Sequence, residues 1–424
     1  MPNPSEYIAP DQLCIGLYVH LDLSWMDHPF TFNSFKIRSQ KEIDTIRRLG
    51  LSLIRYEPDK CDSLPLPPRV VAVPEEAPPP AADTANDATI MKEKAARVEQ
   101  LNRIRREIGA VEKKFHKAAE SARNIRRNIE AQPQLAFLEA ETLVGQMVTM
   151  LSTDEPVVIH AMSNKLGEGV YFHSLNVSVL SLMLARMLNI NASGMRDIGL
   201  GALFHDFGKT DIPDAILLKT EPLTTSEQTF LERHCEYGLA IARKAGLTKP
   251  AQDIVMQHHE YMDGGGYPGK LAGDEITTLA RLVTIVNTYD NLCNPVNPAS
   301  ALTPSETLAQ MFALNRTKFD QEQLQAFIRC IGVYPPGSIV QLSNGMPGLV
   351  LSANPAMPLK PNVLLYDPEV PDEQAVIVNL GQVPDLRINH GLRPGQLPLS
   401  IHRYLNPRTR VTYFFDAPPQ SDEQ

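Results

Sequence analysis

The chain has 424 residues, of which 43% are hydrophobic and 21% are charged, so it is neither wholly disordered nor fibrous. Its net charge of −9 argues against a protein that coats nucleic acid polymers or an anionic membrane, because both need a basic surface. The length predicts several domains, since a typical domain has about 100–200 residues.

The five cysteines are odd in number and form no Cys-x-x-Cys pair, which argues against a disulfide framework and a zinc ribbon. The first ten residues lack the basic start and apolar stretch of a signal peptide. The most apolar window, Val177–Ile190, contains Arg186 and is too short to cross a bilayer. We therefore expect a cytoplasmic protein without a membrane span.

Residues 1–61 are predicted to form a small α+β domain. Hydrophobic side chains alternate with others from Leu13 to Leu23, which is typical of a half-buried strand. A helix through Ile43 and Ile46, ending at Gly50, and a strand at Leu51–Tyr56 follow. Residues 62–89 contain seven prolines and are predicted to be a linker.

Residues 90–132 are predicted to form a long helix with a coiled-coil seam. Its apolar positions recur at alternating steps of three and four: Leu101, Ile104, Ile108, Val111, Phe115, Ala118, Ala122, Ile125 and Ile129. One interpretation is a homodimer through residues 101–129. The other is a long helix packed on its own chain, and the small Ala118 and Ala122 side chains weaken the dimer seam.

Residues 134–330 carry long helical stripes and few strand signals, which predicts an all-α domain. Residues 335–416 are predicted to form a small β-rich module. The expected strands there are short runs separated by Pro, Gly and Asn: Ile339–Leu342, Leu349–Leu351, Val363–Tyr366, Ala375–Leu380 and Val411–Phe415.

The helical region collects possible metal ligands. They are His173, His205, Asp206, His234, His258 and His259. Imidazole and carboxylate donors without thiolates suit Fe, Mn, Zn or Ni rather than a structural zinc cage. So many imidazoles with a carboxylate able to bridge favour two metals, and two metals about 3.5–4 Å apart are a known device for phosphoester hydrolysis.

The surroundings of these residues favour a phosphate site over scattered core histidines. The His205-Asp206 pair ends an apolar helix, and Gly208 and Lys209 follow it. The glycine allows close backbone approach, and the lysine offers a cation for a phosphate. The His258-His259 pair runs into the glycine-rich loop Asp263–Pro268, where Tyr267 can stack or donate a hydrogen bond.

Three ordered segments resemble the HD-GYP group of HD-superfamily phosphohydrolases, bacterial enzymes that hydrolyse cyclic dinucleotides, mostly cyclic di-GMP. The segments are HDFGKTDIPDAILLK at 205–219, RHCEYG at 233–238 and HHEYMDGGGYPGKL at 258–271. The resemblance covers about residues 134–300. It implies an all-α HD domain with two divalent metal ions, of which Fe or Mn are expected.

The resemblance also implies roles for single residues. The five histidines and the aspartate above match metal ligands, Asp206 and Lys209 match catalytic positions, and Lys209 also matches a phosphate contact. The remaining substrate-binding candidates lie in the glycine-rich loop: Asp263, Gly264, Gly266, Tyr267 and Pro268. Asn287 stands where the family has an aspartate ligand, and Asp290, one helical turn on, is an alternative.

The leading interpretation is a metal-dependent phosphodiesterase that converts cyclic di-GMP to linear pGpG, with the further step to GMP left open. Asn287, Val296 and Ala299, which replace a ligand and two cations of the family pattern, motivate an alternative module that binds a cyclic dinucleotide or a protein without turnover. A third interpretation is a phosphohydrolase for another nucleotide. Besides cyclic di-GMP, the expected partners are a second copy of the chain and a protein at the glycine-rich loop.

Overall fold

The computed structural model describes residues 6–23, 28–30, 32–67, 84–152, 157–162, 170–314, 316–353, 357–368, 370, 375–383, 385–406 and 411–416, with backbone alone for 84–98, 100, 101, 170, 171 and 416. The chain divides into two compact units, one of residues 1–104 and 366–376 and one of residues 105–365 and 377–424. Among the described residues, no helix combines the length and apolar character needed to cross a bilayer.

The N-terminal unit contains a four-stranded antiparallel sheet and one short helix. The strands β1 (Glu6–Ile8), β2 (Tyr18–His20), β3 (Ser34–Lys36) and β4 (Ile54–Tyr56) lie in the order β1-β4-β2-β3. Helix α1 (Gln40–Arg48) starts at a capping box, in which Ser39 and Glu42 each accept the other's backbone N–H. The α+β prediction is confirmed, but the strand expected from Leu13 to Leu23 is limited to β2, and Ile15 is exposed.

The long helix α2 runs from Thr84 to Asn128, and thus starts before the expected residue 90. Of the predicted linker, residues 68–83 lie outside the described residues. The side chains of the seam are buried in the core of their own chain over most of its length: Val111, Phe115, Ala118, Ala122, Ile125 and Ile129. They are not available for a contact between two copies, so the predicted homodimer seam is wrong from Val111 to Ile129, and the packed-helix alternative holds there.

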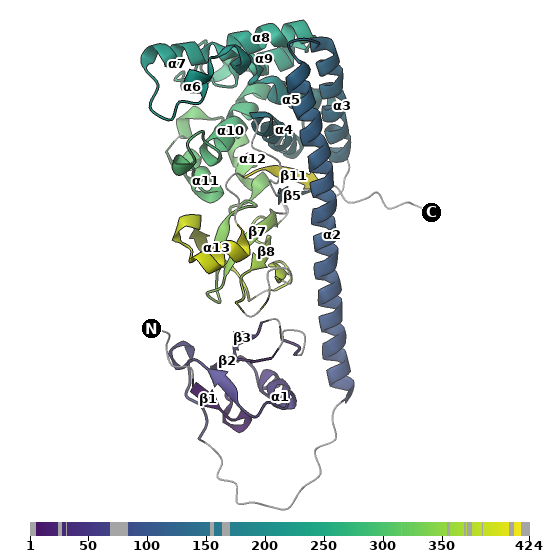
Figure 1. Ribbon diagram of the computed structural model, residues 1–424, viewed down its shortest axis with the longest axis vertical. Coiled ribbons are helices and arrows are strands. Elements are labelled where there is room, and N and C mark those ends of the chain that lie inside the picture. The colour runs from purple at the N-terminus through teal and green to yellow at the C-terminus, as the bar shows by residue number, and fades with distance from the viewer. Residues whose placement is uncertain are drawn as a thin grey trace, which may run out of the picture. The chain divides into compact units, whose positions relative to one another are not determined.

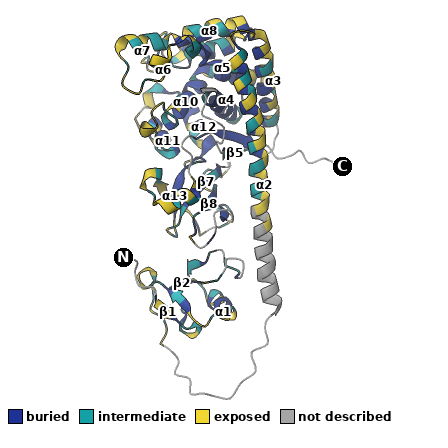
Figure 2. Cartoon of the chain, in the orientation of Figure 1, coloured by how far each residue is buried: buried dark blue, intermediate teal, exposed yellow. Residues whose placement is uncertain are grey.

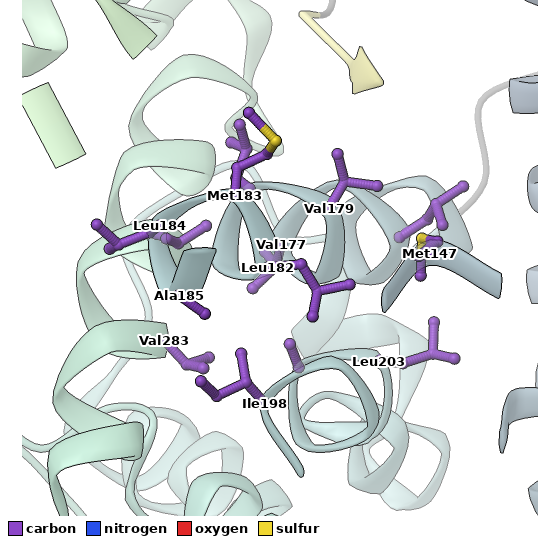
Figure 3. Packing of buried hydrophobic residues seen from close by; sticks show 14 of the residues in the cluster. Met147, Val177, Val179, Leu182, Met183, Leu184, Ala185, Ile198, Leu203 and Val283 are labelled. Carbon is purple, nitrogen blue, oxygen red and sulfur yellow. The ribbon is translucent and has the colours of Figure 1, made fainter. Parts of the chain in front are cut away.

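The larger unit is mainly helical (Figure 1). After α2 it contains α3 (Pro133–Leu151), α4 (Val170–Met187), α5 (Ala192–Phe204), α6 (Asp214–Leu217), α7 (Thr225–Glu232), α8 (His234–Ala245), α9 (Lys249–Gln257), α10 (Thr278–Cys293), α11 (Pro304–Ala313) and α12 (Gln321–Ile331). Helix α4 is almost entirely buried (Figure 2). Its Val177 and Leu182 side chains belong to the same cluster as Met147 of α3, Ile198 of α5 and Val283 of α10 (Figure 3).

A seven-stranded antiparallel sheet completes this unit. It contains β5 (Val158–Ala161), β6 (Ile339–Leu342), β7 (Pro347–Ala353), β8 (Asn362–Leu365), β9 (Ile377–Asn379), β10 (Ile388–Leu392) and β11 (Tyr413–Asp416), and helix α13 (Leu399–Leu405) precedes β11. The order is β10-β6-β7-β5-β11, with β8 and β9 continuing from β7.

This sheet confirms the expected fold class, a multidomain chain with a central helical domain and a strand-rich C-terminal part. It also differs from the sequence expectation in one respect. Strand β5 comes from within the region predicted to be all helical, and it pairs with both β7 and β11. The partner strands of this four-residue strand lie about 190 and 250 positions away in the sequence. Because strand register depends on such long-range contacts, the pairing of β5 could not be predicted from the local sequence. The predicted domain boundaries stay predictions.

Candidate metal centre

The His205-Asp206 pair lies where α5 ends and the short 3₁₀ helix η4 (Phe207–Asp211) begins. Gly208 allows η4 to lie directly against the start of α8. A Cβ at this position would be 2.0 Å from the carbonyl oxygen of His234 and 2.4 Å from the amide nitrogen of Gly238. Only glycine therefore permits the approach that brings Asp206 to His234.

Three histidines of the site share one orientation. His205, His234 and His258 each donate from Nδ1 to the backbone carbonyl three residues earlier, at 2.6, 2.7 and 2.8 Å. Because a carbonyl oxygen only accepts, each Nδ1 carries the hydrogen, and in the neutral ring Nε2 keeps its lone pair. Burial lowers the pKa of His205 to about 4 and also lowers the pKa values of His234 and His258, so the rings are neutral near pH 7.

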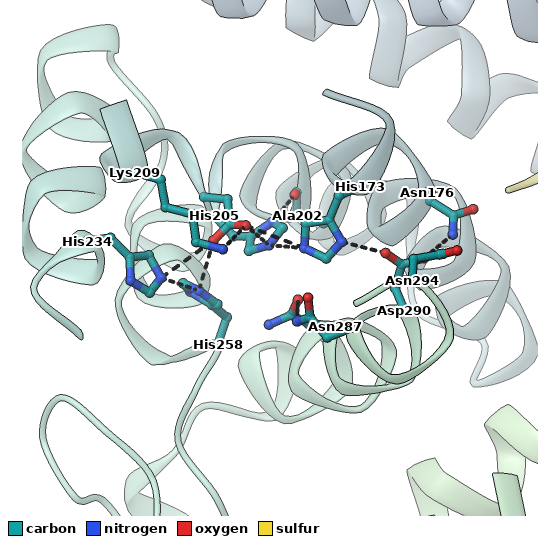
Figure 4. A network of polar contacts seen from close by, with 12 residues as sticks. His173, Asn176, Ala202, His205, Lys209, His234, His258, Asn287, Asp290 and Asn294 are labelled. Carbon is teal, nitrogen blue, oxygen red and sulfur yellow. Dashed lines mark hydrogen bonds and ion pairs between the residues drawn. The ribbon is translucent and has the colours of Figure 1, made fainter. Parts of the chain in front are cut away.

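These lone pairs meet one another in the middle of the site (Figure 4). The Nε2 atoms of His234 and His258 are 3.2 Å apart, and those of His173 and His205 are 3.1 Å apart. His173 also offers a lone pair, because its Nδ1 donates to Asp290 at 2.5 Å. Two facing lone pairs repel, whereas a cation that both can bind removes the repulsion. The donor set therefore fits a metal ion at each pair.

The Asp206 carboxylate lies between the two pairs. Its Oδ2 is 3.4 and 3.5 Å from the Nε2 atoms of His173 and His205, and its Oδ1 is 3.5 and 3.8 Å from those of His234 and His258. Oδ1 is buried and has no hydrogen-bond partner among the described residues. An anionic oxygen in that position is costly unless a cation binds it. Asp206 thus belongs to two possible metal-binding groups, the second of which also includes His259.

Lys209 contributes the nearest positive charge. Its Nζ is 2.6 Å from Asp206 Oδ2. Although burial alone would raise the pKa of Asp206, the Lys209 ammonium holds the pKa of this carboxyl well below its usual range. The carboxylate is therefore ionised over the whole physiological pH range.

The loop Asp263–Pro268 closes the His258-His259 side of the site. At Gly266 a Cβ would be 2.4 Å from the His259 carbonyl oxygen and 2.6 Å from Glu260 Cα, so no larger residue fits. This close approach places the Tyr267 ring parallel to the His259 ring, with centroids 4.5 Å apart and an interplanar angle of 21°. Tyr267 and Gly266 therefore support His259, which itself lies edge-on to His234.

Other residues predicted for this loop lie farther from the histidines. Asp263 is exposed and accepts hydrogen bonds from the Gly265 amide at 3.0 Å and from the Thr317 hydroxyl at 3.3 Å. Gly264 adopts a φ of +75°, which favours glycine, and Pro268 is half-buried after Tyr267. These contacts shape the loop.

Glu260 is a residue that the sequence interpretation missed. Its carboxylate is 1% exposed and accepts the backbone N–H groups of Gly269 at 2.6 Å and Leu271 at 3.0 Å. From the position next to His259, it therefore fixes residues 269–271, which directly follow the glycine-rich loop. An acidic residue directly after the His-His pair was the available signal, but its partners could not be inferred from spacing.

Two residues of α10 have different surroundings from those expected. The Asn287 side chain is buried, points toward the histidines and accepts a hydrogen bond from Asn291 at 2.9 Å (Figure 4). Asp290 does not take the place of an aspartate at 287, because its carboxylate binds His173 and Asn176. It orients the His173 ring, a function that the sequence interpretation did not assign.

A cavity of 420 Å³ opens beside His173 and Asp206. Its described lining combines site residues with side chains from α2, η4, α6 and α10: Arg126, Phe172, His173, Asn176, Asp206, Lys209, Thr210, Ile212, Asp214, Leu217, Leu218, Asp290, Asn291, Asn294, Val296 and Thr412. Of the predicted site residues, His173, Asp206 and Lys209 lie on this cavity. The other predicted site residues are not among the residues that line the cavity; they lie elsewhere in the site or in the glycine-rich loop.

Comparisons with known proteins match two families. Residues 146–323 match the family described as HD domain, and residues 6–140 match a domain of unknown function, DUF3391. The cyclic di-GMP phosphodiesterase PA4108 of Pseudomonas aeruginosa is 28% identical over 396 residues, which cover 92% of each chain.

Two further relatives match over about a third of this chain. The cyclic di-GMP phosphodiesterase response regulator RpfG of Xanthomonas campestris is 32% identical over 35% of this chain and 39% of its own length. The 3'3'-cGAMP-specific phosphodiesterase 2 of Vibrio cholerae is 32% identical over 35% of this chain and 29% of its own length. Residues 146–323, which contain the ordered histidine and glycine-rich segments, thus match the HD-domain family.

Proposed function

We propose that this chain is a metal-dependent cyclic dinucleotide phosphodiesterase that hydrolyses cyclic di-GMP to linear pGpG. The observation that carries the proposal is the pair of facing Nε2 contacts on either side of the Asp206 carboxylate. Relatives named as cyclic di-GMP phosphodiesterases, one of which matches over nearly the whole chain, support the substrate class.

The proposed ligands follow from the two groups of donors. His173 and His205 would hold one cation, and His234, His258 and His259 the other, with Asp206 shared by both. Asn287 is a candidate for a further oxygen ligand. Two such cations lower the pKa of water and neutralise charge on a phosphodiester. Iron or manganese suits this set of imidazole and carboxylate donors without thiolates.

The protein side chains would bind and orient the substrate. Lys209 lies at the cavity and beside Asp206, so its ammonium can donate to a phosphate oxygen that enters there. Asp290 keeps the His173 ring in the tautomer whose Nε2 faces the site. Glu260 and Gly266 keep His259 and Tyr267 in place from the opposite side.

A second candidate function is a module that binds a cyclic dinucleotide without turnover. The buried Asn287 amide favours it, because a neutral oxygen is a weaker ligand than a carboxylate for a hard cation. A phosphohydrolase for another cyclic dinucleotide is the third candidate. The expected cytoplasmic location and a protein partner at residues 263–268 stay predictions.

One experiment separates these functions. The full chain is purified anaerobically, its metal content is measured, and hydrolysis of cyclic di-GMP and of 3'3'-cGAMP is followed with added Fe²⁺ or Mn²⁺. Close to two metal ions per chain and production of pGpG support the proposed enzyme. Binding without product, in both the wild type and Asn287→Asp, would contradict it and support the binding module.

A further inference from the structure

An arginine from outside the HD-domain match lies on the cavity of the site. Arg126 is near the C-terminal end of α2, within the segment that matches the domain of unknown function. Its neighbours Ala122, Ile125 and Ile129 are buried in the core, with exposures of 2%, 0% and 1%. This part of α2 is therefore fixed against the helical domain, and the position of Arg126 is fixed with it.

The surroundings of the Arg126 guanidinium leave one donor unused. Its Cζ lies 5.6 Å from the centroid of the Phe207 ring, next to Asp206 in the sequence. One terminal nitrogen is buried and has no hydrogen-bond partner among the described residues. A buried donor without an acceptor is unfavourable, and more so when it is charged. Burial lowers the pKa of Arg126, while the Asp206 and Glu130 carboxylates act in the opposite direction.

Arg126 also lines the cavity, where an acceptor for its guanidinium can enter. Two of the described residues that line the cavity are basic, Arg126 and Lys209. They come from different elements of the chain. Lys209 already contacts Asp206 at 2.6 Å, whereas the Arg126 nitrogen has no such partner. At the rim, Leu218 and Val296 are 68% and 57% exposed. The cavity thus combines cationic donors with apolar surface, which suits a ligand that carries both phosphates and flat bases.

We infer that Arg126 is a substrate-binding residue whose guanidinium donates to a phosphate oxygen of the cyclic dinucleotide. The inference rests on the proposed function for the identity of the ligand. A guanidinium is well suited to this contact, because its planar set of donors matches phosphate oxygens. The long helix of the N-terminal family match therefore contributes directly to the pocket of the HD domain.

The test compares Arg126→Gln and Arg126→Lys with Arg127→Gln in the metal-loaded full chain. Arg127 is the matched control, because it is exposed on the same turn and donates to Asn124. The probe is a hydrolysis-resistant bis-phosphorothioate analogue of cyclic di-GMP, and its dissociation constant is measured by calorimetry. Metal content and thermal midpoint are recorded for each variant.

We expect Arg126→Gln to raise the dissociation constant by about tenfold or more, since a hydrogen bond to a charged group is lost. Arg126→Lys should fall between it and the wild type, and Arg127→Gln should stay within about twofold, as an exposed side chain contributes little. Metal content should not change.

Equal affinity of the wild type and Arg126→Gln would overturn the inference. It is also overturned if the Gln and Lys variants lose affinity equally and lose metal with it, because the residue is then structural. A wild type that binds the analogue but releases no product from cyclic di-GMP contradicts the proposed function alone. A wild type that does not bind the analogue overturns both.

Discussion

His234 and His258 face each other through Nε2 atoms that are 3.2 Å apart, and each ring donates its Nδ1 hydrogen to a backbone carbonyl. The contact is buried, and the His258 ring is held neutral by that burial. Without a cation, two lone pairs would be held together in a region of low dielectric. The His173–His205 pair repeats the arrangement on the other side of Asp206.

This relationship predicts that metal binding stabilises the folded chain. Removal of metal by EDTA should lower the thermal midpoint by about 5–10 °C, because a ligand at one hundred times its dissociation constant contributes about 2.7 kcal/mol. Thermal unfolding with EDTA and after addition of Mn²⁺ measures the effect. An unchanged midpoint would show that the folded site does not bind the ion.

Loss of one ligand should remove metal as well as activity. His205→Ala should lose about one metal ion per chain and all measurable hydrolysis, because His205 belongs to one of the two groups. Elemental analysis of the purified variant measures the metal. His390→Ala, an exposed histidine of β10, is the control. Unchanged metal content in His205→Ala would contradict the ligand assignment.

The contact between His173 and Asp290 predicts an effect through orientation. Asp290→Asn leaves the size of the side chain unchanged but removes the carboxylate that accepts the His173 Nδ1 hydrogen. Metal affinity should fall by about 10–100-fold, the usual effect of losing such a partner. Titration with Mn²⁺ gives the affinity, and Asp274→Asn, at an exposed ion pair, is the control. Equal affinities for Asp290→Asn and the wild type would show that His173 needs no such support.

The close approach at Gly266 predicts a local defect. A methyl group there would lie 2.4 Å from the His259 carbonyl oxygen, so Gly266→Ala must move the loop and Tyr267 away from His259. We expect a loss of stability of about 1–3 kcal/mol and a clear loss of activity. Gly395→Ala, with no atom within 4 Å of the added carbon, is the control. Full activity in Gly266→Ala would contradict the role of this loop in supporting His259.

The helical domain and the candidate ligands could be predicted from the sequence, because both depend on local patterns. The strand at Ile339–Leu342 has the expected limits. The sequence does not predict whether the apolar face of α2 packs against a second copy or against its own chain. Steps of three and four residues fit a dimer seam and a helix packed on its own chain equally well. The burial of Phe115 and Ile125 in the chain's own core decides it.

The contacts that support the ligands could not be predicted either. His173 and Asp290 are 117 positions apart, and no spacing rule connects them. The Glu260 carboxylate accepts two amides of a loop whose path depends on Gly266. The signals for candidate ligands are residue types, whereas the signals for their supports are geometric. Sequence reasoning could therefore propose the ligands but not their supports.

The most direct measurement of the central claim is anomalous X-ray diffraction from crystals of the Mn²⁺-loaded chain. The account predicts two anomalous peaks on either side of the Asp206 carboxylate, one bound by His173 and His205 and the other by His234, His258 and His259. A single peak, or peaks that do not share Asp206 as a ligand, would contradict it.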